Sequence, residues 1–308
     1  MGWLTIELER IMELCLGTVQ FGMDYGINGK KKPSMKECME CMDYAVNNGI
    51  RSIDTAAAYG NAEEVVGLFL KNKTIDREQL WISSKLLPNI LDNCSPIKYR
   101  EIIRGEVVKS LQILGTDYLD GYYFHSARYS FNSDMIEALY ELQLEGLVKK
   151  IGVSVYETNE ANACLESDKI SIIQVPYSVF DHRMETAHVF ELAKETKTEI
   201  NVRSAFLQGL VLKNRKTVPP YLQEAADLVD VFQRISEKCG IDRVTLALAY
   251  VKKERNVSRL VFGIHSLDQL KNNVEAFNTE VPDEILQEIK KRFDDVSKQI
   301  VIPSLWKK

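Results

Sequence analysis

Residues 53–60, with the sequence IDTAAAYG, join a short apolar segment to a segment that favours a helix. Residues 49–53 (GIRSI) are typical of a short buried strand and residues 61–70 of a helix, so Asp54 ends the strand and Tyr59 lies in the following loop. In a barrel of alternating strands and helices, such strand ends and loops build the active face. This pair alone could simply cap the helix and cover the loop, but the arrangement recurs along the chain.

The whole chain alternates short apolar segments with helical ones. Strands are expected at residues 14–20, 51–54, 79–85, 118–125, 149–154, 170–175, 199–204 and 259–263. Helices are expected at residues 62–70, 99–114, 134–145, 157–165, 185–196, 222–253, 267–277 and 282–296, after a first helix that begins at Ser34. This alternation implies parallel strands with right-handed crossovers, and eight strands favour a closed α/β barrel of the (β/α)8 or TIM type.

The length and the absence of linkers predict a single domain. The chain has 308 residues, and one such barrel takes about 250. We therefore expect one barrel over residues 1–308, with residues 1–11 as an upstream extension and residues 282–308 as a C-terminal helix and tail. No GxGxxG motif follows the first strand, which argues against a dinucleotide-binding Rossmann domain.

The composition is that of an ordinary globular protein, with 45% hydrophobic and 27% charged residues. A net charge of −5 and a pI near 5.6 argue against nucleic acid as a partner. No uncharged apolar run approaches the ~18 residues of a membrane span, and the N-terminus lacks a signal-peptide core. The six cysteines are scattered, and the lone CxxC at residues 38–41 lacks a second ligand pair for zinc. We expect a reduced, cytoplasmic protein without a metal site.

Chemically useful side chains end successive strands. Lys85 and His125 end the third and fourth strands, as Asp54 ends the second. A buried lysine needs an opposite charge, which Asp54 can supply. A tyrosine near that lysine has its phenolate favoured, so we expect the pKa of Tyr59 to be lowered. The set predicts proton delivery by Tyr59 to a carbonyl that His125 orients, whereas Lys85 alone would also fit a Schiff-base aldolase.

These residues carry a family resemblance. The motifs DTAAAYG, SSK, YYFH, GVS, IIQVPY and FLQGL, in this order over residues 14–277, resemble those of the aldo-keto reductase superfamily. The resemblance implies a (β/α)8 barrel that binds NADP(H), with NAD(H) as the alternative, and reduces an aldehyde or ketone. It assigns the family's catalytic tetrad to Asp54, Tyr59, Lys85 and His125.

The resemblance also implies a cofactor site. Its expected residues are Gly17, Thr18, Ser154, Gln174, Arg203, Ser204, Phe206, Leu207, Gly209, Gly263, Gln269 and Asn273. The chain departs from the family at Val155, which replaces an asparagine, and at Arg203, which replaces an aromatic residue. A basic residue that many members use for the 2′-phosphate corresponds to Gln269, which leaves the choice between NADPH and NADH open.

Several alternatives remain open at this stage. A nicotinamide-binding redox sensor or regulatory subunit would keep the barrel, and a sugar-pathway enzyme would use bound nicotinamide transiently. The expected partner is a small carbonyl substrate, and neither its identity nor the oligomeric state is encoded. Other polar residues are interpreted as follows: His182, His188 and His265 as surface or cap positions, Lys30–Lys32 as a solvated loop, and Tyr129, Phe131 and Trp306 as candidate walls of a substrate pocket.

Overall fold

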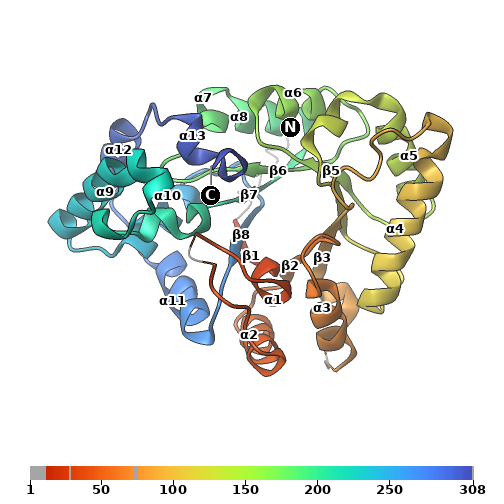
Figure 1. Cartoon of the computed structure of the whole chain (residues 1–308), viewed down its shortest axis with the longest axis horizontal. Helices are drawn as coiled ribbons and strands as arrows, with labels where there is room; N and C mark the ends of the chain where they lie inside the picture. Colours follow the sequence, from red (N-terminus) through yellow and green to blue (C-terminus); the bar gives the residue numbers. More distant parts are fainter. Residues whose placement is uncertain (1–11, 28, 73–74, 307–308) are drawn as a thin grey trace, which may run out of the picture.

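The protein is a closed barrel of eight parallel strands (Figure 1). The computed structural model describes residues 12–306, except residues 28 and 73–74. The strands follow each other around the barrel in chain order, and β8 pairs with β1 to close it. Their bounds are β1 (Glu13–Gly17), β2 (Ser52–Asp54), β3 (Trp81–Lys85), β4 (Gly121–Phe124), β5 (Ile151–Ser154), β6 (Ile172–Pro176), β7 (Glu199–Arg203) and β8 (Arg259–Gly263). This confirms the expected fold class.

Helices surround the barrel on all sides in Figure 1. They are α1 (Val19–Gly22), α2 (Met35–Asn47), α3 (Ala62–Lys71), α4 (Tyr99–Leu114), α5 (Ser133–Leu144), α6 (Thr158–Leu165), α7 (Arg183–Thr186), α8 (Val189–Thr196), α9 (Ala226–Cys239), α10 (Arg243–Lys252), α11 (Leu267–Asn278), α12 (Asp283–Arg292) and α13 (Lys298–Val301). Within the described ranges, no helix is both long enough and apolar enough to cross a bilayer. The proposed extension at residues 1–11 lies outside the described part.

Two expected helices are interrupted for local reasons. The helix expected at 185–196 is divided between α7 and α8, because His188 adopts a left-handed conformation with φ 55°. The long helix expected at 222–253 stops at Gly240, with φ 70°, and restarts after Asp242. The Asp242 side chain accepts hydrogen bonds from the backbone N–H groups of Val244 and Thr245, which satisfies the first free donors of α10. Neither break changes the number or the order of the strands.

The amino-terminal end of the barrel is closed by an ion cluster. Arg259, the first residue of β8, is buried and donates hydrogen bonds to Ser52 Oγ (3.2 Å) and Glu199 Oε2 (3.2 Å). Its guanidinium also lies 4.2 Å from the ring centroid of Trp81. Ser52, Trp81 and Glu199 are themselves the first residues of their strands. The buried charge of Arg259 is thus paired within the barrel. The active site of such a barrel lies at the opposite end, where the strands have their carboxyl ends.

Candidate active site

A buried ion pair lies at the carboxyl ends of β2 and β3. Lys85 is 0% exposed, and its Nζ lies 2.5 Å from Asp54 Oδ2 and donates a second hydrogen bond to the carbonyl oxygen of Thr55 (2.9 Å). The other oxygen of Asp54 accepts from Ser83 Oγ (2.9 Å) and from Gln174 Nε2 (3.0 Å). The pairing expected from the sequence is therefore present, and three further groups hold the two charges in place.

Tyr59 lies beside this pair, in the loop between β2 and α3. Its ring centroid is 5.1 Å from Lys85 Nζ, and its ring meets that of His125 edge-on at 5.7 Å. Burial, together with the negative charge of Asp54, raises the pKa of Tyr59 above that of a free tyrosine. The expected lowering of the pKa is wrong, because burial of Tyr59 and the negative charge of Asp54 outweigh the positive charge of Arg203. Tyr59 consequently keeps its proton.

The backbone around Tyr59 is fixed by two glycines. A Cβ on Gly22, the last residue of α1, would lie 1.7 Å from the carbonyl oxygen of Tyr59. Gly60 has φ 57°, and a Cβ there would lie 2.3 Å from the carbonyl oxygen of Gly22. The N–H of Asn61 donates to that same oxygen (3.4 Å). Only glycines allow α1 to approach the loop this closely.

His125 follows β4 and faces Tyr59. Burial, aided by the positive charges of Lys85 and Arg203, lowers the pKa of His125 to about 3. Its Nδ1 is buried, and neither ring nitrogen is hydrogen-bonded to any residue of the described part. A neutral imidazole with free nitrogens can donate a hydrogen bond to a carbonyl oxygen placed beside Tyr59.

These groups open into a cavity of about 660 Å³. Asp54, Tyr59 and His125 line it, while Lys85 lies beneath the surface. All twelve residues expected to bind the cofactor line the same cavity: Gly17, Thr18, Ser154, Gln174, Arg203, Ser204, Phe206, Leu207, Gly209, Gly263, Gln269 and Asn273. The strand ends and the loops thus bring the two predicted groups together into one site.

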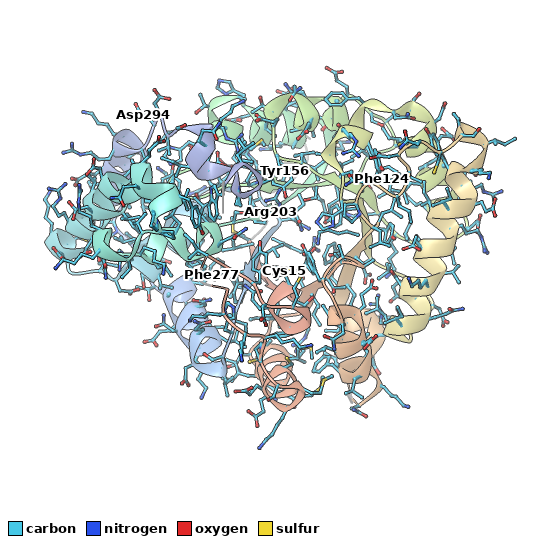
Figure 2. All side chains as sticks on the ribbon, viewed as in Figure 1. Cys15, Phe124, Tyr156, Arg203, Phe277 and Asp294 are labelled. Carbon is cyan, nitrogen blue, oxygen red and sulfur yellow. The ribbon has the colours of Figure 1, made fainter. Side chains whose placement is uncertain are left out.

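Arg203 is held at the catalytic end of the cavity. Its guanidinium donates to Ser154 Oγ (3.4 Å), to the carbonyl oxygen of Val155 (2.9 Å) and to Ser204 Oγ (3.2 Å). It also lies 4.3 Å from the ring centroid of Tyr156, and both side chains are labelled in Figure 2. No carboxylate in the described part of the chain pairs with it, so its charge remains available to a ligand.

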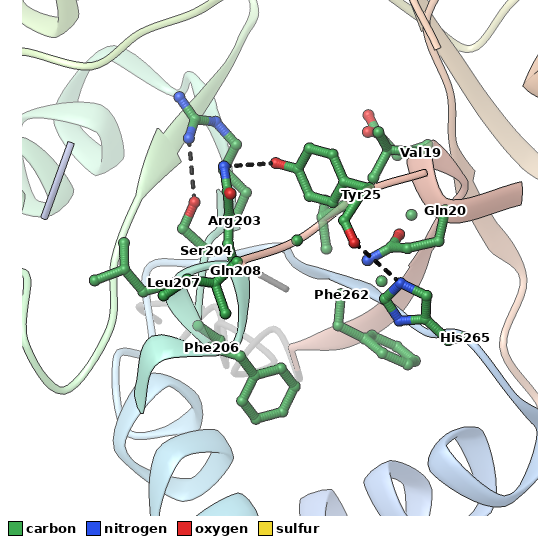
Figure 3. A pocket seen from close by; sticks show the side chains of 18 of the residues that line it. Val19, Gln20, Tyr25, Arg203, Ser204, Phe206, Leu207, Gln208, Phe262 and His265 are labelled. Carbon is green, nitrogen blue, oxygen red and sulfur yellow. Dashed lines mark hydrogen bonds between the residues drawn. The ribbon is translucent and has the colours of Figure 1, made fainter. Parts of the chain in front are cut away.

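The loop that contains Tyr25 and Ile27 meets the loop that contains Gln208 across the cavity (Figure 3). The sequence did not predict this contact between the loops. The N–H of Ile27 donates to the carbonyl oxygen of Gln208 (3.1 Å), and the Gln208 side chain donates to the hydroxyl of Tyr25 (3.2 Å). His265 Nε2 lies 3.3 Å from the carbonyl oxygen of Tyr25. Tyr25 lies outside the quoted motifs, and Gln208 lies within FLQGL without having been assigned to the site; loop geometry brings both to the cavity. His265 was expected at the surface or at a cap, and it lines the cavity instead.

Other expectations need correction. Lys30 is exposed, as expected for a solvated loop, but it also lines the cavity together with Lys213. His182 is buried and stacks on Tyr250 at 4.9 Å, so it is not at the surface, but it is the N-cap residue of α7. His188 is exposed and is the N-cap residue of α8, as expected. The three candidate substrate-pocket residues do not line this cavity: Tyr129 donates to Asp92 Oδ1 (2.9 Å), Trp306 donates to the carbonyl oxygen of Ile300 (3.0 Å), and Phe131 is exposed.

The cavity fits a polar, elongated ligand. Gln20 is 92% buried, yet its Oε1 has no hydrogen-bond partner in the described part of the chain. A Cβ on Gly263 would lie 2.2 Å from the Gln20 amide, so only glycine fits beside it. Unsatisfied buried polar atoms such as Gln20 Oε1 and His125 Nδ1 call for a partner. The cavity therefore offers unpaired polar atoms to a ligand both beside Tyr59 and beside β8.

Comparison with known proteins identifies the family. A model described as the aldo/keto reductase family matches residues 13–293. The NADH-specific methylglyoxal reductase of Escherichia coli (strain K12) is 29% identical over 318 aligned positions, covering 92% of this chain and 94% of its own. The glyoxal reductase of Bacillus subtilis (strain 168) is 27% identical over 268 positions, covering 85% and 93%. The holo form of aldo-keto reductase AKR11C1 from Bacillus halodurans superposes with a TM-score of 0.75 at 26% identity, covering 93% and 94%.

The fold and the site therefore define a nicotinamide-dependent carbonyl oxidoreductase. The chain belongs to the aldo/keto reductase family.

Proposed function

We propose that Tyr59 is the proton donor in the reduction of a small aldehyde or ketone by this chain. The observation that carries the proposal is the ring of Tyr59, which lies against the neutral His125 ring and beside the buried Asp54–Lys85 pair. The raised pKa of Tyr59 supports this role, because a general acid must hold its proton until the carbonyl oxygen becomes basic.

When bound, the reduced nicotinamide supplies the hydride that the carbonyl carbon accepts. Ser154, Gln174 and Arg203 would hold its carboxamide end, and Gly263, Gln269 and Asn273 its adenosine end. Tyr59 then donates its proton to the carbonyl oxygen, and the Lys85 ammonium stabilises the phenolate that remains. His125 donates a hydrogen bond to the same oxygen and thereby orients the substrate.

We further propose NADP(H) as the preferred cofactor, with NAD(H) as the alternative. Lys30 and Lys213 line the cavity on the two loops that meet across it. Repulsion from Lys30, after burial, lowers the pKa of Lys213, which supports their proximity. Two ammonium groups this close favour a phosphate between them. Lys30 and Lys213 would supply the positive charge for the 2′-phosphate that the neutral Gln269 does not supply.

For the substrate, we propose 2-oxoaldehydes of the kind that the named relatives reduce, methylglyoxal and glyoxal. The experiment combines the purified protein with NADPH or NADH and each aldehyde, and follows cofactor absorbance. We expect turnover with the wild type. Tyr59→Phe should lower kcat by about 10²–10⁴-fold and leave the Kd of the cofactor unchanged. Cofactor binding without turnover on any small carbonyl would favour the redox-sensor alternative, and full activity of Tyr59→Phe would exclude the proposed proton donor.

A further inference from the structure

The loops that follow two strands of the tetrad are joined by a ring of hydrogen bonds. Ser126 directly follows His125, and Asn89 lies in the loop after Lys85. The N–H of Asn89 donates to Ser126 Oγ (2.8 Å), and this hydroxyl donates in turn to Asn89 Oδ1 (3.1 Å). The single hydroxyl of Ser126, which is 6% exposed, therefore bonds twice to one residue. We call this pair of bonds the Asn89–Ser126 ring.

Neighbouring side chains brace the ring from outside. Arg128 donates to Asn89 Oδ1 (2.8 Å) and forms an ion pair with Asp92. The hydroxyl of Tyr129 donates to Asp92 Oδ1 (2.9 Å) and accepts from the N–H of Leu91 (3.1 Å). Each of these bonds links the loop after β3 with the segment after β4.

Asn89 also adopts a conformation that the ring requires. Its φ is 65°, in the left-handed region, which asparagine tolerates better than most residues. Asn93 in the same loop has a similar φ of 59°, but its side chain forms no hydrogen bond in the described part of the chain. The two asparagines therefore share a backbone conformation, but only Asn89 forms the hydrogen bonds of the Asn89–Ser126 ring.

His125 has no hydrogen bond of its own to hold its ring. Its Nδ1 is buried without a partner in the described part of the chain, and its ring contact is with Tyr59. The direction of the imidazole is consequently set by the backbone on either side of it. We propose that the Asn89–Ser126 ring is a positioning device that aims His125 at the carbonyl oxygen. This inference rests on the role proposed for His125 above.

The test uses variants that break or keep the ring. Ser126→Ala removes both bonds, Asn89→Gly keeps the left-handed backbone but removes Oδ1, and Asn89→Asp restores an acceptor there. With methylglyoxal and 4-nitrobenzaldehyde as probes, we expect Ser126→Ala and Asn89→Gly to lower kcat/KM about 10- to 100-fold at unchanged cofactor Kd. Asn89→Asp should recover most of the activity. Asn93→Gly, the matched control, should behave like the wild type.

Two readouts separate positioning from a general structural effect. In a His125→Gln background, Ser126→Ala should have no further effect on kcat/KM, because the two residues act in series. An undiminished effect there would overturn the proposal.

The second readout needs no turnover, so it also survives a failure of the proposed function. The chain has four histidines, and the Cε1 proton resonance of His125 is assigned by its loss in His125→Gln. We expect this resonance to shift in Ser126→Ala and in Asn89→Gly, but not in Asn93→Gly. An unshifted resonance in both ring variants would overturn the proposal. If Ser126→Ala fails to fold, Asn89→Gly, which alters an exposed loop residue, decides alone.

Discussion

Burial controls the protonation of Tyr59 and His125, the two groups that we propose to contact the substrate carbonyl. It raises the pKa of Tyr59 and lowers that of His125 to about 3, so both residues are neutral over the usual pH range. A neutral phenol beside a neutral imidazole can offer two hydrogen-bond donors to one carbonyl oxygen. The charges nearest to these two rings belong to the buried Asp54–Lys85 pair and to Arg203.

The low pKa of His125 has a consequence for stability. Between pH 6.5 and about 3, the unfolded chain binds a proton at this position that the folded chain does not. The free energy of unfolding therefore falls as the pH is lowered through this window, by up to about 1.4 kcal/mol per pH unit. His125→Gln should lose this contribution, so its stability should depend less on pH. Urea unfolding at pH 7, 6 and 5 measures the slopes, with His188→Gln, an exposed site, as control; equal slopes for all three proteins would contradict the prediction.

Breaking the buried ion pair should cost far more than breaking an exposed one. Lys85→Met leaves the Asp54 carboxylate buried without its counter-charge, and we expect a loss of about 3–5 kcal/mol in the free energy of unfolding. The double variant Asp54→Asn/Lys85→Met should recover part of this loss, because no net charge stays buried. Lys36→Met, which breaks the exposed pair with Glu40, is the control and should change stability little. Denaturant unfolding decides, and a loss for Lys85→Met no larger than that of Lys36→Met would refute this account.

At the scale of elements, the site depends on close backbone packing between α1 and the loop that leads to α3. Gly22→Ala would drive a methyl group into the backbone of Tyr59. We expect a loss of about 1–3 kcal/mol in stability and a fall in kcat, because the loop must shift. Gly105→Ala in α4 is the matched control: nothing lies within 4 Å of its Cβ, and it should gain about 0.5–1 kcal/mol. Thermal unfolding and kcat together test this, and normal activity in Gly22→Ala would argue against it.

The loop after β7 illustrates what sequence reasoning cannot reach. Ser204, Leu207, Gln208 and Gly209 all have positive φ, between 46° and 95°. Leu and Gln rarely adopt this conformation, so no residue preference predicts it. The strand ends were predictable, because an Asp or Lys that terminates an apolar run has a fixed place in a parallel barrel. Burial of His182 and the pKa of Tyr59 were not, since both depend on neighbours distant in sequence.

At the scale of the whole molecule, the charge distribution favours an anionic cofactor. The net charge is −5, yet Lys30, Lys213 and Arg203 line the cavity. We expect Lys30→Met to weaken NADPH about tenfold, which corresponds to about 1.4 kcal/mol, and to weaken NADH less. The affinity of the variant for NADPH should also fall less steeply with added salt. Lys31→Met, an exposed neighbour that does not line the cavity, is the control. Titration by cofactor fluorescence at several salt concentrations tests this, and equal effects of the two substitutions would contradict it.

The ion cluster of Arg259, Glu199, Ser52 and Trp81 lies at one end of the barrel and the tetrad at the other. Loops at the catalytic end can therefore be exchanged for those of a relative without touching the contacts that close the opposite end. The molecule is accordingly a modular scaffold for engineering: new substrate loops can be grafted and screened while the anchoring end is left unaltered.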